Sequence, residues 1–208
     1  MKIGVIGAGW LGGTVAEALV RAGHEVMFSS RNPDKYADVA RRVGPTASAG
    51  TTRDAAEHGE VVLIAVPYRA LAGVGEELAD VLAGKIVIDA CNPYPGADPA
   101  ELIEAGEDKG VALASAERLP GTRYVRCFSS VDATEIEASS RGRRREPLAV
   151  PLVSDDANAC ELVAGLVRDV GCVPVIVGGL TEGRGFQRGG PAFRLHVGEA
   201  ELRGRLHV

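Results

Sequence analysis

Two patterns of hydrophobic positions alternate along the first half of the chain. Continuous apolar runs occupy residues 2–6, 60–67 and 85–91, and such runs are typical of strands that are covered on both faces. Between these runs, apolar side chains recur every three or four residues, as at Val15 and Leu19, which is the spacing of a helix with one buried face. Strands that alternate with helices predict βαβ units and a parallel sheet.

The same alternation continues further along the chain. We expect further strands near 124–130, 148–153 and 173–177, and helices near 71–82, 157–170 and 199–203. The pattern predicts the α/β class, with residues 1–180 forming a Rossmann-type domain around a doubly wound, mostly parallel sheet. Residues 181–208, which are rich in Gly and Arg, are predicted to form a C-terminal segment that closes a cleft or lies at a dimer interface.

A glycine motif, G-x-G-x-x-G, joins the first predicted strand to the first predicted helix. Gly7 permits a tight turn, Gly9 lets the backbone approach a pyrophosphate, and Gly12 lets the helix pack closely on the strand. The helix N-terminus that follows offers unpaired N–H groups to an anion. The motif therefore predicts a dinucleotide-binding site, and the alternative is that the three glycines only form a tight strand-to-helix turn.

The end of the second predicted strand indicates which dinucleotide is bound. In chains that bind NAD, an acidic residue about 20 residues beyond the glycines contacts the ribose, whereas an Arg nearby accommodates the 2′-phosphate of NADP. Here Ser30, Arg31 and Asn32 occupy this place and no acid is present. These donors suit a phosphate, so NADP(H) is predicted, with Lys35 as a weaker phosphate contact. The alternative is that Ser30 and Asn32 cap the next helix and Arg31 is solvated.

Composition narrows the class of partner. A formal net charge of −5 argues against nucleic acid, whose phosphates are bound through clustered positive charge. The run Arg141–Arg145 is the exception and is predicted to be an exposed loop between two strands. No segment approaches the roughly 20 apolar residues that span a bilayer, and the four cysteines form no C-x-x-C pair. We expect a cytoplasmic protein with no metal site, no nucleic acid and no membrane among its partners.

Taken together, these motifs resemble those of the deazaflavin-dependent NADP reductase family, whose members exchange hydride between NADP(H) and the deazaflavin coenzyme F420. The chain is also similar to the NADPH domain of the six-transmembrane metalloreductases, which share that fold. The resemblance covers the chain to about residue 180 and rests on the order and spacing of these segments: 7–12, 30–33, 65–68, 89–93 and 150–156.

The resemblance implies roles for individual residues. Gly9, Trp10 and Leu11 would face the pyrophosphate, and Ser30, Arg31 and Lys35 would hold the 2′-phosphate. The residues implied at the nicotinamide end come from the segments that follow two central strands: Ala65, Val66, Pro67, Asn92 and Pro93. One departure matters, because Arg126-Cys127-Phe128-Ser129 stands where family members often have a Lys-Ala-Phe-Asn type of strand end. This difference concerns the identity of the hydride acceptor more than the binding of NADP(H).

Several activities are compatible with these residues. Hydride transfer between two stacked cofactors needs alignment and a dry cleft but no general acid. An alternative is NADPH-dependent reduction of a small imine, carbonyl or alkene, for which Tyr68, Tyr94, Asp132 or a bound water would donate the proton. A third possibility is an NADP(H) sensor without catalytic activity. Tyr68 is the candidate catalytic side chain, and its other role would be an aromatic wall over the nicotinamide.

The size of the chain constrains where a second ligand binds. At 208 residues, a dinucleotide domain leaves little room for a separate substrate domain, so a small-molecule substrate or second cofactor would share the cleft. A cleft closed only by a short segment favours a homodimer. An acidic coenzyme F420 would need cationic contacts, for which Arg69, Arg126, Arg184 and Arg188 are available.

The 2′-phosphate assignment makes a prediction. Replacing Arg31 with Ala removes one charge-assisted phosphate contact and should weaken NADPH binding by at most a few kcal/mol, while NADH binding changes little. Titration of the wild-type protein and the variant with each dinucleotide measures this difference. Equal losses for NADPH and NADH would contradict the assignment of Arg31 to the phosphate.

Overall fold

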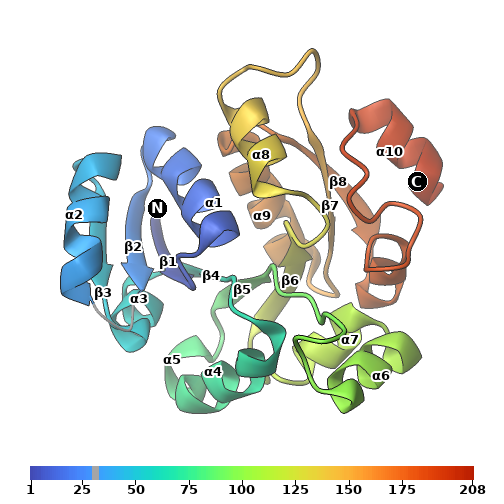
Figure 1. The fold of residues 1–208 in the computed structure, drawn as a ribbon, viewed down its shortest axis with the longest axis horizontal. Helices are drawn as coiled ribbons and strands as arrows, with labels where there is room; N and C mark the ends of the chain where they lie inside the picture. The colour runs from blue at the N-terminus through green and yellow to red at the C-terminus, as the bar shows by residue number, and fades with distance from the viewer. Residues whose placement is uncertain (30–32) are drawn as a thin grey trace.

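A single eight-stranded sheet runs through the molecule (Figure 1). The computed structural model describes residues 1–29 and 33–208, and the strand order is β3-β2-β1-β4-β5-β6-β7-β8. The strands are β1 (Lys2–Ile6), β2 (Glu25–Ser29), β3 (Ala47–Gly50), β4 (Val61–Ile64), β5 (Ile86–Asp89), β6 (Arg123–Cys127), β7 (Ala149–Val153) and β8 (Val173–Gly178). Strands β1 to β6 are parallel, β7 is antiparallel to β6, and β8 is parallel to β7. The predicted Rossmann-type, mostly parallel sheet is confirmed.

Helices cover both faces of this sheet. One face carries α1 (Trp10–Arg21), α2 (Pro33–Val43), α8 (Ala133–Ser140) and α9 (Ala157–Asp169). The other carries α3 (Thr52–His58), η1 (Tyr68–Ala70), α4 (Leu71–Glu77), α5 (Ala79–Leu82), α6 (Ala100–Lys109), α7 (Val111–Ala116), η2 (Leu180–Gly185) and α10 (Glu199–Leu206). Each face has its own hydrophobic core, and the sheet separates the two.

Alternate residues of the central strands belong to opposite cores. In β4, Val61 and Leu63 pack with α1 and α9, whereas Val62 and Ile64 pack with the helices of the other face. All four are at most 1% exposed. Successive side chains of a strand point to opposite faces, so a strand that is covered on both sides needs apolar residues throughout. This explains the continuous apolar runs in the sequence.

Three features differ from the prediction. The expected helix over 71–82 is two helices, α4 and α5, that meet at Leu78. Gly75 lies in α4 where a Cβ would meet the backbone oxygen of Arg118 at 2.0 Å, so a close approach of chain segments takes precedence over helix propensity there. Helix α8 was not predicted, because its 8 residues present few apolar side chains to the core. Consequently, the arginine-rich loop 141–145 joins a helix to a strand rather than two strands.

The C-terminal segment packs on the same core as the rest of the chain. Phe186 and Leu202 are fully buried, and α10 contacts β7 and β8. The segment before α10 also crosses the carboxyl edge of the sheet, where the backbone N–H of Arg194 donates to the carbonyl of Ser130 at 2.9 Å. Residues 186–198 therefore form a strap (hereafter, the strap) beside the ends of β5 and β6. Of the described residues, none belongs to a helix long and apolar enough to cross a bilayer.

Candidate functional site

The loop between β1 and α1 contains three glycines with different surroundings. Gly7 has φ +91°, and a Cβ built on it would lie 2.4 Å from the backbone oxygen of Ala65. A Cβ on Gly12 would lie 2.3 Å from the backbone oxygen of Gly7. At Gly9, in contrast, nothing lies within 4 Å of the Cβ position. Gly7 and Gly12 are therefore required by packing, whereas Gly9 faces open space.

The open space at Gly9 lies at the N-terminus of α1. Gly9 is the N-cap residue, no side chain caps the helix, and its first turn contains no acidic residue. The first N–H groups of a helix have no intrahelical partners and carry partial positive charge. An uncapped helix of 12 residues that starts at an open glycine fits the pyrophosphate of a dinucleotide.

The ends of β1 and β4 lie side by side, with Ile6 paired to Ile64. Strand order reverses here, because the chain continues from β1 to β2 on one side and reaches β4 on the other. Ala65 and Val66, which follow β4, pack against Gly7, and Pro67 is exposed. The structure thus brings 65–67 to the glycine loop, at the switch point where ligands bind in open α/β sheets.

The predicted 2′-phosphate contacts cannot be placed in the same way. Ser30, Arg31 and Asn32 lie outside the described residues, as does the side chain of Lys35. Strand β2 ends at Ser29 and α2 begins at Pro33. The assignment of these four residues to the 2′-phosphate stays a prediction from the sequence.

A cavity of about 160 Å³ (the cleft cavity) lies beside the N-terminus of α1. Trp10 and Leu11 form one wall, and residues after β5 and β6 form another. The complete lining is Trp10, Leu11, Asn92, Tyr94, Ser129, Val131, Asp132, Ala133, Phe193 and Arg194. Trp10 is 72% exposed, so its indole is accessible from this cavity.

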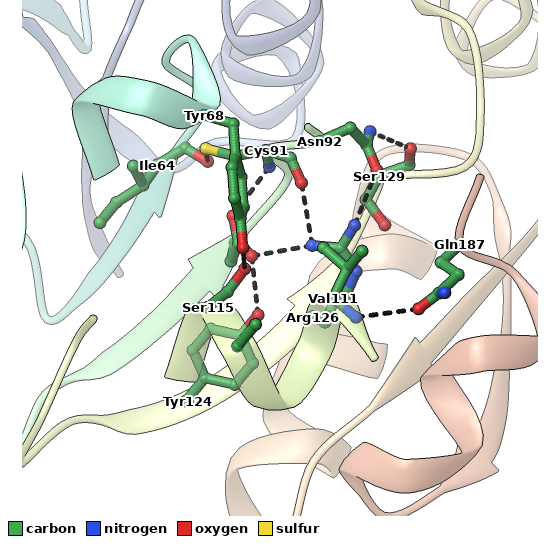
Figure 2. Close-up of polar contacts among 12 residues, drawn as sticks. Ile64, Tyr68, Cys91, Asn92, Val111, Ser115, Tyr124, Arg126, Ser129 and Gln187 are labelled. Atoms are coloured by element: carbon green, nitrogen blue, oxygen red, sulfur yellow. Dashed lines mark hydrogen bonds and ion pairs between the residues drawn. The ribbon is translucent and has the colours of Figure 1, made fainter. Parts of the chain in front are cut away.

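A buried ion pair joins β5 and β6 next to Asn92, which lines this cavity (Figure 2). Arg126 on β6 donates from Nη1 to Asp89 Oδ2 on β5 at 2.8 Å, and both side chains are 0% exposed. Asp89 also accepts from the Tyr124 hydroxyl at 2.7 Å and from the backbone N–H of Cys91 at 2.8 Å. Burial is the largest single effect on the pKa of Arg126 and lowers it, but Asp89, Tyr124 and Cys91 together raise it above its usual value, so the guanidinium stays charged.

Arg126 also fixes the amide of Asn92. Its Nη2 donates to Asn92 Oδ1 at 2.7 Å, and Asn92 Nδ2 in turn donates to the backbone oxygen of Ser129 at 2.6 Å. Because Arg126 can only donate, the Asn92 oxygen must face it and the amide cannot flip. Within the described structure, the buried hydroxyls of Ser129 and Ser130 have no hydrogen-bond partner. Ser129 lines the cleft cavity, and its hydroxyl is buried there without a partner among the described residues.

Tyr68 does not line the cleft cavity. It is 1% exposed and belongs to the hydrophobic core of the face that carries α3 to α7. Ser115 donates to its hydroxyl at 3.2 Å, and the guanidinium of Arg118 lies 5.3 Å from its ring centroid. Burial raises its pKa. The 3₁₀ turn after Pro67 directs this side chain into the core (Figure 2), so its geometry suits packing and does not support the predicted role as a proton donor or a wall of the nicotinamide site.

The cysteines are placed as buried apolar groups. Cys91, Cys127, Cys160 and Cys172 are all free and buried. Burial raises the pKa of Cys160 and Cys172 to about 11, and it raises the pKa of Cys91 and Cys127 well above the usual value. At neutral pH these thiols are protonated and poor nucleophiles.

The sequence analysis missed a cluster at the edge of the cleft cavity. His196 Nε2 accepts the backbone N–H of Asp132 at 3.1 Å. Arg194 donates from Nε to the Asp132 carboxylate at 3.2 Å. These contacts tie the strap to the loop after β6. No local pattern predicts them, because 62 to 64 residues separate the partners.

The arginine-rich loop has partners close by. Arg141 and Arg143 form ion pairs with Glu137 at 3.0 and 3.1 Å, and Arg144 contacts Glu135. Arg144 also donates to the backbone oxygen of His196 at 2.8 Å. Three of these arginines thus neutralise the carboxylates of α8.

With this geometry in view, comparison with known proteins identifies the family. The family model for coenzyme F420-dependent NADP oxidoreductases matches residues 2–93. The F420-dependent NADP reductase of Methanothermobacter thermautotrophicus is 30% identical over 199 residues, which are 88% of this chain and 84% of that enzyme. The chain belongs to the coenzyme F420-dependent NADP oxidoreductase family. It is an NADP-dependent oxidoreductase.

Two further proteins extend this comparison. The metalloreductase STEAP3 of Rattus norvegicus is 29% identical over 186 residues, and the match covers 88% of this chain but only 35% of the metalloreductase. The crystal structure of a hypothetical protein from Sinorhizobium meliloti superimposes with a TM-score of 0.80 and 29% identity, covering 96% of each chain. The chain therefore shares its fold with this protein over nearly its whole length.

The different surroundings of the glycines lead to a paired prediction. Gly9→Ala should leave thermal stability unchanged and weaken NADPH binding by roughly tenfold or more, because its methyl group enters only the space left for the pyrophosphate. Gly12→Ala should instead lower the melting temperature, because its methyl group meets a backbone oxygen. Differential scanning calorimetry and quenching of the single tryptophan, Trp10, measure the two effects. A Gly9→Ala variant that binds NADPH as tightly as the wild type would refute this use of the loop.

The buried ion pair leads to a second prediction. Arg126→Met leaves the Asp89 carboxylate buried and unpaired, and should lower the free energy of unfolding by about 3–5 kcal/mol. Adding Asp89→Leu removes the unpaired charge and should restore part of that loss. Urea unfolding of both single variants and the double variant measures the coupling. Losses that simply add in the double variant would show that the two charges do not stabilise one another.

Proposed function

We propose that this protein transfers hydride between NADP(H) and the deazaflavin coenzyme F420, with both bound at the carboxyl edge of β1, β4, β5 and β6. The observation that carries the proposal is the position of the cleft cavity, which adjoins the uncapped N-terminus of α1 and the open face of Gly9. Membership of the F420-dependent family supports the same pair of ligands.

Each part of the site would bind one part of NADP(H). Residues 7–12 would hold the pyrophosphate through backbone N–H groups, and Ser30, Arg31, Asn32 and Lys35 would bind the 2′-phosphate. Residues 65–67 together with Asn92 and Pro93 would border the ribose and nicotinamide. When bound, NADPH supplies a hydride from its nicotinamide ring.

The residues around the cleft cavity would align the second ring. Trp10, Tyr94 and Phe193 give the cavity aromatic walls, which suit a planar ring. Asn92 is held rigidly by Arg126, and the free hydroxyl of Ser129 would hydrogen-bond a polar group of either ligand. Hydride transfer between two aligned rings needs no protein acid, which agrees with the burial of Tyr68 in the core.

A second candidate is NADPH-dependent reduction of a small imine, carbonyl or alkene. The observation that favours it is Asp132, a carboxyl group in the wall of the cleft cavity that would supply the proton such a reaction requires. Its ion pair with Arg194 opposes this role, because the carboxylate already has a protein partner. Reduction of a small organic substrate is therefore the alternative function. The homodimer also stays a proposal from the sequence.

Stopped-flow absorbance tests the proposed reaction. Mixing the protein with NADPH and oxidised F420 should bleach the deazaflavin rapidly, and NADH in place of NADPH should do so far more slowly. Ser129→Ala should raise the KM for F420 by roughly threefold to tenfold through one lost hydrogen bond.

Ser130→Ala is the matched control, because Ser130 has an equally unpartnered hydroxyl but does not line the cleft cavity. Tight NADPH binding without bleaching would overturn the F420 assignment and favour an organic substrate or a sensor. Equal effects of the two serine variants would remove Ser129 from the site.

A further inference from the structure

A second cavity (the side cavity) lies next to the cleft cavity and is larger, at about 490 Å³. Its walls are Ile103 and Gly106 on α6, Pro93 and Pro95 in the loop after β5, and residues of the strap. These walls are mostly apolar. A volume in this range is typical of sites for small organic molecules.

The two cavities share a wall. Phe193 lines both of them. The loop after β5 also borders both, with Tyr94 at the cleft cavity and Pro93 and Pro95 at the side cavity. The cleft cavity, at about 160 Å³, holds a ring but not a ring with a long substituent. A larger ligand whose ring lies in the cleft cavity would therefore extend past Phe193 into the side cavity.

The contacts of the nearby arginines indicate what that substituent carries. Arg126 is buried in its ion pair with Asp89. Arg69 donates to the backbone oxygen of Ala97 at 2.8 Å and lies 3.8 Å from Asp98. Arg184 donates to the backbone oxygen of Glu107 at 3.0 Å. All three therefore already have protein partners.

Arg188 differs from these three. It lines the side cavity, and its guanidinium lies 5.5 Å from the centroid of the Tyr94 ring. Among the described residues it has no carboxylate partner within ion-pair distance. Stacking on an aromatic ring holds a guanidinium in place and leaves its N–H groups free in the plane of the fork. Such a group is suited to a carboxylate or phosphate.

We propose that the side cavity binds the non-reacting part of the hydride partner, and that Arg188 binds a carboxylate or phosphate carried by that part. The inference rests on the proposed function, since it assumes that the reacting ring occupies the cleft cavity. Gln187 contributes to the same wall, where its Oε1 accepts the backbone N–H of Val111 at 2.8 Å (Figure 2). This bond leaves its amide N–H groups pointing away from Val111, available to a ligand. Glu107 also lines the cavity and would oppose an anion bound close to it.

Steady-state kinetics with NADPH and F420 tests the proposal. Arg188→Gln should raise the KM for F420 about tenfold, with kcat and the Kd for NADPH close to wild type, because the lost contact lies away from the reacting ring. Arg188→Lys keeps the positive charge and should recover part of the loss. Ile103→Phe should also raise this KM by filling the cavity. Glu107→Gln should act in the opposite direction and lower it slightly.

The matched control is Arg145→Gln, which removes an exposed charge from the loop between α8 and β7. Comparison with this variant separates a local contact from a change in net charge. If Arg188→Gln and Arg145→Gln raise the KM for F420 equally, the proposal fails while the F420 activity stands. In a parallel assay with a deazaflavin that lacks the anionic side chain, Arg188→Gln should leave the KM unchanged. A rise in that KM as large as the rise in the KM for F420 would also overturn the proposal.

A binding assay covers the case in which the wild type does not reduce F420. Anilinonaphthalenesulfonate has apolar rings and one anionic group, and its fluorescence reports binding without catalysis. We expect it to bind wild type about tenfold more tightly than Arg188→Gln or Ile103→Phe, with Arg145→Gln unchanged. If the protein does not bleach the deazaflavin but the dye affinities follow this order, the F420 assignment is contradicted. The same result would support the side cavity as an anion-binding subsite. Equal affinities for all four proteins would overturn the inference itself.

Discussion

The buried ion pair between Arg126 and Asp89 is the interaction on which the candidate site depends. Two charges removed from water are stable only when each is paired and hydrogen-bonded, and here Asp89 receives two donors from β6 and one from the backbone just after β5. The same guanidinium reaches Asn92, whose amide holds the backbone at Ser129. The ends of the two strands are thereby locked to each other. The floor of the cleft cavity can thus stay rigid although residues in loops form it.

The glycine loop imposes a second constraint, on the opposite side of the same cavity. Gly7 and Gly12 allow β1, α1 and the segment after β4 to approach so closely that a methyl group would collide with backbone. This packing places the open N-terminus of α1 beside Trp10 and the ends of β5 and β6. A parallel sheet brings all these carboxyl ends to one edge. The N-terminus of α1 and the ends of β5 and β6 therefore form different walls of the same cavity.

The sequence was informative wherever a feature depends on neighbouring residues. Apolar runs such as 60–67 and the glycine spacing after β1 are local, so the parallel sheet and the dinucleotide loop could be predicted. Features that depend on distant partners could not be predicted. Arg126 and Asp89 are 37 residues apart, and the contact of His196 with Asp132 joins the strap to the loop after β6. Tyr68 shows a third kind of difficulty, because it follows a central strand as expected but a 3₁₀ turn directs its ring into the core.

The two halves of the chain contribute differently to the chemistry. The family model matches residues 2–93, the part that contains the glycine loop, the switch point and Asn92. The side chains that would meet the hydride partner lie beyond it, with Ser129 after β6 and Arg188 and Phe193 in the strap. In the proposed arrangement NADP(H) would meet backbone at a helix N-terminus, which constrains the sequence through glycines. The hydride partner would meet side chains at the cavity walls, which form little of the packing within the sheet. On this proposal the strap and the ends of β5 and β6 would determine the identity of the hydride partner, and substitutions there would alter it while cofactor binding is retained.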